Sequence, residues 1–277
     1  MIQAQTKRQN FSHLIKIYTA HIKIWMALQF QYRVAMLIWM IGLVIQPVIY
    51  MVVWANVAEA NGGVVNGYTT SDFAAYFIAA MVVNHLAYTW HAWEYDFNIR
   101  QGKLSPRLLR PMHPIHSDIA ENISFKVLSQ IVMIPTTIAL ILLFNPTWSP
   151  QLWSLLVFVP AIIMAFIIQF MFGWCVAIMA FFTTRVVAII RVYFLGKFFL
   201  GGQMAPLPML PVGLQTLAKF TPYPWMVYFP VELLLGRMTP EAAAKGLVTQ
   251  LFWVVVSLIC VRLLWRAGVK RYAAFGA

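Results

Sequence analysis

Polar and aromatic side chains recur at helical spacing inside one long apolar stretch of this chain. Asn84, Tyr88, His91 and Tyr95 follow one another at intervals of four, three and four residues, which places them on one face of a helix. Polar groups in such a stretch face either a cavity or another helix. The face therefore suits contact with a solute as well as helix packing, and both interpretations stay open.

A second apolar stretch contains an isolated positive charge. Lys197 lies twelve residues after Arg185, which is about 18 Å along a helix and close to the middle of a hydrocarbon core about 30 Å thick. An ammonium group at that depth lines a path or a subunit interface, reaches an interfacial water pocket, or pairs with a carboxylate such as Glu94 or Glu232. A lysine lining favours an anionic or amphipathic ligand, whereas the aromatic face favours a hydrophobic cation. The two signals conflict.

Catalytic and cofactor-binding patterns are absent from the sequence. It contains no Gly-x-x-x-x-Gly-Lys-Ser/Thr phosphate loop, no His-Glu-x-x-His and no Gly-x-Ser-x-Gly, and its eight acidic residues are scattered. Glu94 and Asp96 are two residues apart and so point to different sides of a helix. His113 and His116 are separated by Pro114, which argues against a shared helical face. We therefore expect no enzyme, no metal site and no bound cofactor on this polypeptide.

The composition is that of a polytopic helical membrane protein. The chain of 277 residues is 61% hydrophobic and only 10% charged, with a mean hydropathy of +0.74, so its elements are expected to cross a bilayer as helices. The net charge of +12 is spread over the flanks of apolar runs, which excludes nucleic-acid binding and fits contact with lipid headgroups. We predict one all-α transmembrane domain over residues 1–277, with spans at residues 34–57, 73–93, 127–144, 155–180, 187–205 and 246–264.

Charge placement predicts the orientation of these spans. Lys and Arg gather in both termini, in residues 99–118 and at Arg185, whereas residues 58–71 and 145–151 contain neither. By the positive-inside rule, both termini are cytoplasmic. An amphipathic pattern over residues 10–33 predicts a helix lying in the membrane interface. The proline-rich and aromatic segment 206–230, between spans five and six, predicts re-entrant helices on the outer side.

The cytoplasmic segment 99–118 predicts a short and rigid helix. Ser105 and Pro106 begin it, Leu108 and Leu109 give it an apolar side, and the prolines that follow end it. One interpretation is a solvated basic loop that only enforces topology. The other is a docking element for a cytoplasmic partner, because an exposed Leu-Leu pair on a fixed helix has no other evident use.

Three segments together resemble the permease subunits of ABC-2 type exporters, and most closely the small six-span bacterial permeases. They are Ile99-Arg-Gln-Gly-Lys-Leu followed by Leu108-Leu-Arg-Pro111, Gly201-Gly-Gln-Met-Ala-Pro206-Leu-Pro-Met-Leu-Pro211, and Pro222-Tyr-Pro-Trp-Met-Val-Tyr-Phe-Pro230. The resemblance covers nearly the whole chain in length, order and topology. It implies two permease subunits, identical or related, in the plasma membrane, driven by separate ATPase subunits that bind ATP and Mg²⁺.

The resemblance also assigns roles to individual segments. Residues 10–33 become an elbow helix, and the helix between Lys103 and Met112 becomes the coupling helix that enters a cleft of the ATPase. The coupling residues are then Lys103, Leu104, Arg107, Leu108, Leu109 and Arg110. The candidates for a substrate path are Asn84, Tyr88, His91 and Lys197. The implied function is export of an amphipathic or xenobiotic-like compound by alternating access; the alternative is a non-transport, receptor-like membrane protein that docks another partner.

Overall fold

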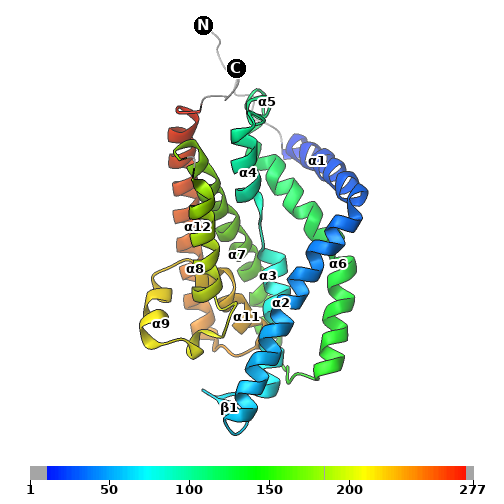
Figure 1. The fold of residues 1–277 in the computed structure, drawn as a ribbon, viewed down its shortest axis with the longest axis vertical. Helices are drawn as coiled ribbons and strands as arrows, with labels where there is room; N and C mark the ends of the chain where they lie inside the picture. The colour runs from blue at the N-terminus through cyan, green and yellow to red at the C-terminus, as the bar shows by residue number, and fades with distance from the viewer. Residues whose placement is uncertain (1–10, 184, 273–277) are drawn as a thin grey trace.

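The computed structural model describes residues 11–183 and 185–272, and it is almost entirely helical (Figure 1). Within these residues, five helical segments are long and apolar enough to cross a membrane. They are α2 (Arg33–Ala60), the segment Thr70–Arg100, α6 (Pro114–Phe144), the segment Leu152–Phe181 that contains α7 (Leu152–Ile178), and α12 (Pro240–Val269). The prediction of an all-α polytopic membrane protein is therefore confirmed.

The fifth predicted span, residues 187–205, differs from the other five in length. Its helix, α8, covers Val186–Leu200 and has 15 residues, fewer than the roughly 20 that a hydrocarbon core of about 30 Å requires. Beyond Leu200 the chain makes turns and then three short helices and a 3-10 turn before α12. The count of six spans is therefore not established by helix length.

A break divides the second predicted span. Residues 73–93 were expected to form one helix, but α3 ends at Ala87 and α4 begins at His91 (Thr70–Ala87 and His91–Arg100), and Figure 1 shows the thin connection between them. The local sequence offers neither proline nor glycine as a cause. Instead, the Lys126 ammonium from α6 donates to the carbonyl of Tyr88 at 2.6 Å, and a side chain inserted in this way interrupts a helix.

The segment between α4 and α6 is shorter than predicted, because Pro114 begins a helix. A short α5 covers Ser105–Leu108, and α6 then begins at Pro114, thirteen residues before the predicted start of the third span at 127. The expectation that Pro114 only ends the preceding helix was wrong. Proline suits the first turn of a helix, where its missing N–H has no intrahelical acceptor, and the His113 ring accepts from the Ile115 amide at 3.2 Å to cap that turn.

Helix α1 (Phe11–Gln31) lies across the first half of α6, next to α5 (Figure 1). The Tyr18 hydroxyl meets His116 Nδ1 at 2.6 Å, and the Gln29 amide donates to the carbonyl of Glu121 at 3.1 Å. Only Tyr32 separates α1 from α2. These contacts fix α1 against α6 at the end of the molecule that carries α5, which we call the α5 end.

The opposite end carries a small hairpin of β1 (Val64–Val65) and β2 (Tyr68–Thr69), and we call it the hairpin end. The segment after α8 folds back here as a 3-10 turn, α9, α10 and α11 (Leu207–Met209, Val212–Lys219, Tyr223–Met226 and Tyr228–Leu235). The segment is anchored in protein: the Tyr76 hydroxyl donates to Gly202 O at 2.7 Å, and the Trp54 indole to Met204 O at 2.9 Å. Such anchoring is what irregular backbone requires at membrane depth.

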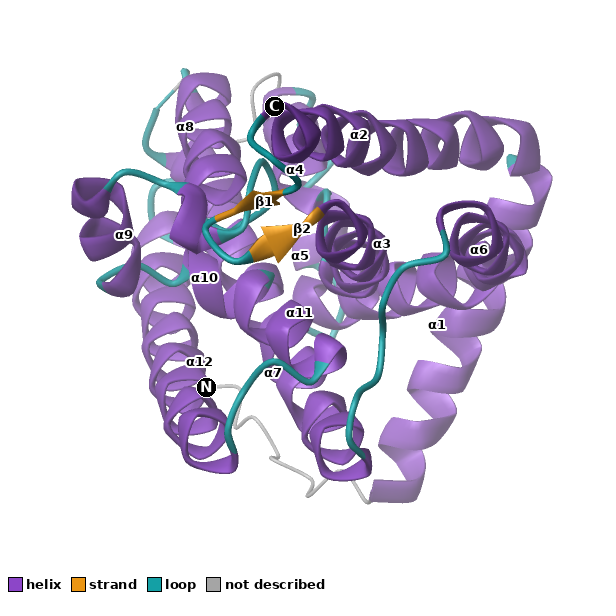
Figure 2. Cartoon of the chain, turned by 90° about the horizontal axis from the view of Figure 1, so that it is seen from below, coloured by secondary structure: helices purple, strands orange, loops and turns teal. Residues whose placement is uncertain are grey.

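Helix α7 occupies the middle of the arrangement. It packs against α12, α11, α4 and α3, and Figure 2, which looks at the hairpin end, shows α2, α3 and α6 on one side of it and α8, α9 and α12 on the other. Helix α3 is mostly buried, whereas α2 and α6 turn large apolar side chains outward, for example Trp39 and Leu142. In a bilayer such faces contact lipid.

Candidate functional site at the break between α3 and α4

Two lysines reach the break from different helices. Lys126 of α6 donates a hydrogen bond to the carbonyl of Tyr88. Lys197 of α8 is only 2% exposed, and its ammonium lies 5.2 Å from the ring centroids of both Tyr88 and Phe194. Aromatic faces attract cations, but far more weakly than a carboxylate would. The structure therefore brings Tyr88 and Lys197 together and adds Lys126, which the sequence analysis did not single out.

Neither lysine has an acidic partner in the described part of the chain. The ion pairs found there are Arg100 with Asp96, Arg107 with Asp118, and Arg237 with Asp72. Both carboxylates considered as partners for Lys197 have other contacts. Glu94 accepts from the Trp90 indole at 3.0 Å, and Glu232 accepts from the Tyr68 hydroxyl at 3.4 Å. The suggested pairing of Lys197 with either of them was wrong.

The predicted polar face divides at the break. Asn84, on α3, accepts a hydrogen bond from the Gln203 amide at 2.6 Å, which ties α3 to the segment after α8. His91 begins α4 and is buried against Phe170, with ring centroids 4.6 Å apart. Since Tyr88 and His91 no longer belong to one helix, the continuous face of 84, 88, 91 and 95 does not form. Gln203 could have been identified from the sequence as a candidate, because it is a polar residue that follows two glycines in an otherwise apolar run.

An acidic cluster lies on the other side of α4, toward α5. Asp118, 2% exposed, forms an ion pair with Arg107, whose guanidinium also donates to Pro114 O at 3.3 Å. Glu94 and Glu121 are close enough to interact with both members of the pair. Burial alone would lower the pKa of Arg107, but Asp118, Tyr95 and Glu121 together outweigh burial and raise it. Arg107 therefore stays charged and fixes the loop to α6.

The coupling residues predicted between 103 and 110 point in two directions. Leu104 is fully buried and Leu108 half-buried in the core that α4 and α7 share, whereas Leu109 is 88% exposed. Lys103 and Arg110 are also exposed, and the Lys103 ammonium lies 4.6 Å from the Phe97 ring centroid. Inward-pointing Leu104 and Arg107 thus hold the segment, and outward-pointing Lys103, Leu109 and Arg110 form its free surface.

The two histidines of this loop are occupied by structural contacts. Burial, together with the neighbouring His116, lowers the pKa of His113 to about 4, so the ring is neutral near pH 7 and its nitrogen accepts the Ile115 amide. His116 contacts the Tyr18 hydroxyl. Within residues 11–183 and 185–272 there is no group of three or more His, Cys, Asp or Glu side chains that could hold a metal ion.

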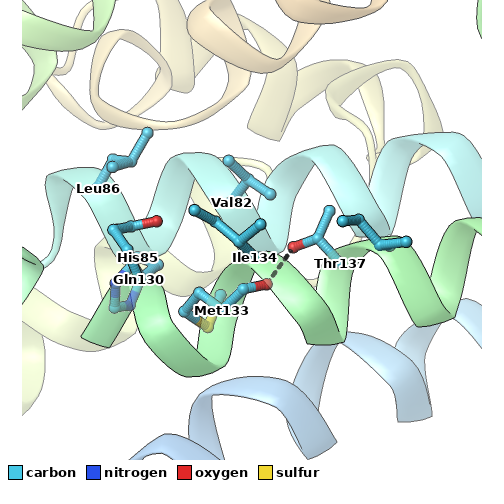
Figure 3. Close-up of a pocket in the computed structure, with 8 residues that line it drawn as sticks. Val82, His85, Leu86, Gln130, Met133, Ile134 and Thr137 are labelled. Carbon is cyan, nitrogen blue, oxygen red and sulfur yellow. Dashed lines mark hydrogen bonds between the residues drawn. The ribbon is translucent and has the colours of Figure 1, made fainter. Parts of the chain in front are cut away.

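An apolar groove lies between α3 and α6 (Figure 3). Several of its polar groups have partners: Thr137 donates to Met133 O at 2.8 Å, the contact dashed in Figure 3, and His85 Nε2 meets the Ser129 hydroxyl at 2.8 Å. The lining residues are Val82, His85, Leu86, Gln130, Met133, Ile134, Thr137 and Ile138. No acidic or basic side chain lines this groove apart from His85.

Comparison with known proteins assigns the chain to a family. The family model described as "ABC-2 family transporter protein" matches residues 43–276, from the middle of α2 past the end of α12. No curated protein and no solved structure matches the chain significantly. The matched range contains α5, the break and the segment after α8. The chain therefore belongs to the ABC-2 transporter family and is a membrane permease of an ABC transporter.

Proposed function

We propose that this permease exports an amphipathic or xenobiotic-like compound by alternating access. It works with a second permease subunit, identical or related, and ATP hydrolysis takes place on separate ATPase subunits that hold ATP and Mg²⁺. Family membership supports the transport role. The observation that carries the rest is the α5 segment, which is rigidly held and yet exposes an apolar side chain.

The α5 segment combines an exposed docking surface with a firm connection to α6. Leu109, 88% exposed, lies beside the exposed cations Lys103 and Arg110, a combination that suits insertion into a cleft with an acidic rim. Behind it, buried Leu104 and the Arg107–Asp118 ion pair connect the segment to α6. A displacement of α5 by the ATPase is thereby passed to α6, and through Lys126 to the break.

The distribution of charge supports a cytoplasmic α5 end. Exposed Lys103, Arg110, Arg185 and Arg266 belong to this end. At the hairpin end, residues 61–69 and 145–151 contain no Lys or Arg, and of the cations there, Lys219, Arg237 and Lys245, Arg237 is paired with Asp72. Both termini then face the cytoplasm in the inner membrane, and α1 lies along the inner surface as an elbow helix. The sixth crossing is completed by α8 together with the anchored stretch 201–206.

Substitution of Leu109 tests the docking surface. Leu109→Asp should greatly reduce the amount of ATPase that copurifies with the tagged permease in mild detergent, quantified by mass spectrometry, because burying an unpaired carboxylate at an interface costs several kcal/mol. Leu109→Met should bind normally. Leu108→Asp is the matched structural control: Leu108 is half-buried in the permease itself, so this variant should lose permease stability.

The opposite result would overturn this assignment. If Leu109→Asp copurifies as much ATPase as the wild type and transports at the same rate, then α5 is not the docking element. Partners of another class, such as a kinase in place of an ATP-binding cassette subunit, would instead support a receptor-like protein.

A further inference from the structure

Lys126 and Lys197 place two ammonium groups at one point of the protein without a counter-ion. All eight acidic residues of the chain lie within the described residues, and none of them pairs with either lysine. Both contact Tyr88: the Lys126 ammonium donates to its carbonyl at 2.6 Å, and the Lys197 ammonium lies 5.2 Å from its ring centroid. Because buried charges are costly unless they are paired, this arrangement is incomplete without an anion.

The break supplies further groups that favour negative charge. The backbone amides of Thr89 and Trp90 make no hydrogen bond within the described residues. Helix α4, ten residues long, begins directly after them without a side-chain cap. Helix N-termini attract anions through their free amides and their dipole. The independent pointer to a ligand is Lys197, a buried cation that lies over Tyr88, next to this helix start, and whose ammonium has no hydrogen bond or ion pair with any residue that the structure describes.

Aromatic side chains separate Lys197 from the surface of the protein. Trp93 is 41% exposed and stacks on Phe194 with ring centroids 6.0 Å apart. The outer face of α8 continues this apolar surface with Val192 and Leu195, which are 68% and 56% exposed. A hydrophobic tail can therefore lie against these residues, beside the Phe194 ring that contacts Lys197.

The nearby carboxylate of Glu94 does not neutralise the lysines. Its side chain accepts from Trp90 and interacts with Asp118 and Arg107, so it belongs to the acidic cluster on the α5 side of the break. Neither lysine therefore gains an acidic partner from Glu94. This placement resolves the conflict in the sequence signals in favour of an anionic ligand.

We propose that the break, with Lys126 and Lys197, binds the anionic headgroup of an amphipathic molecule: a carboxylate, sulfate or phosphate. The tail of this molecule lies against Trp93 and Phe194. Where the bound molecule is the transported compound, this inference rests on the proposed function and names its substrate class as anionic amphiphiles. A lipid phosphate is the other source of the same chemistry.

Fluorescence quenching tests the site on the full-length permease in nanodiscs of zwitterionic lipid. The probe is dodecanoate brominated at the end of its tail, which quenches Trp90 and Trp93 when it is bound, and the matched cation is dodecyltrimethylammonium with the same tail bromination. We expect saturable quenching by the dodecanoate only. Lys197→Met should weaken its binding about tenfold or more, since a charge-assisted contact is lost, and Lys197→Arg should keep most of the affinity.

Arg191→Met is the matched control, because Arg191 is an exposed cation on the same helix and should leave the affinity unchanged. Three results would each overturn the proposal. The cationic probe binds as tightly as the dodecanoate, Lys197→Met binds the dodecanoate with wild-type affinity, or Arg191→Met loses as much affinity as Lys197→Met. Phosphatidylglycerol added to the nanodiscs distinguishes the sources. Competition that depends on Lys197 supports a lipid headgroup, and persistence of dodecanoate binding supports a transported anion.

The readout requires no ATPase, so the two proposals fail separately. A permease that captures its ATPase through Leu109 but binds no dodecanoate would refute only the anion site. A permease that binds dodecanoate through Lys197 but copurifies no ATPase would refute only the proposed exporter.

Discussion

Two groups of charged residues lie on opposite sides of the break between α3 and α4, and they differ in one respect. On the α5 side, the buried Asp118 carboxylate forms an ion pair with the half-buried Arg107. On the other side, Lys126 and Lys197 have no acidic partner in the described residues. The comparison separates a charge that the chain satisfies itself, which fixes α5 against α6, from two lysines that the chain leaves without an acidic partner, for which we propose an anionic ligand.

The largest effect is expected on the paired side. Asp118→Ala leaves the half-buried Arg107 guanidinium without its partner, which should lower the free energy of unfolding by about 2–3 kcal/mol. Thermal unfolding in nanodiscs, followed by intrinsic fluorescence, measures the loss, and proteolysis near Arg110 should become faster. The double variant Arg107→Met with Asp118→Ala should recover part of the stability. If Asp118→Ala unfolds at the wild-type temperature, the pair does not hold α5.

A smaller effect is expected at the hairpin end. The Arg237–Asp72 pair, at 2.5 Å, is about one-quarter exposed on each side chain (24% and 25%), so solvent screens it. Its guanidinium also lies 4.5 Å from the Tyr68 ring centroid. Arg237→Ala should therefore cost only about 1 kcal/mol, and Arg237→Lys less. If Arg237→Ala lowers the free energy of unfolding as much as Asp118→Ala does, burial does not explain a difference in stabilisation between the two ion pairs.

The sequence predicted those parts of the fold that are encoded locally. Apolar runs of spanning length mark α2, α6, α7 and α12, and Ser105–Pro106 marks the start of α5. The break at residues 88–90 was not predicted because its cause is a tertiary contact. Lys126, 38 residues further along the chain, donates a hydrogen bond to the carbonyl of Tyr88. Pro114 was misjudged for a related reason, since the same residue ends one helix or begins the next depending on the backbone around it.

The site was predictable to a similar extent. Lys197 and Tyr88 were chosen for separate reasons, a deep charge and a polar face, and the fold places them in contact. Lys126 was overlooked because a lysine just before an apolar run is indistinguishable in sequence from a charge that only sets topology. Arg107 points inward because it pairs with Asp118, eleven residues further along the chain. The two residues belong to different helices, so helical spacing in the sequence does not predict their contact.

The most direct test of the comparison is the thermal unfolding of Lys197→Met in zwitterionic nanodiscs without added anions. An unpaired lysine within a membrane costs about 2.5–3.5 kcal/mol, and cation–π contacts return about 0.5–2 kcal/mol. The account therefore predicts that Lys197→Met unfolds at the same temperature as the wild type or at a higher one, while Asp118→Ala unfolds at a lower one. A Lys197→Met variant that is destabilised as much as Asp118→Ala would contradict it, because Lys197 would then be a satisfied structural charge.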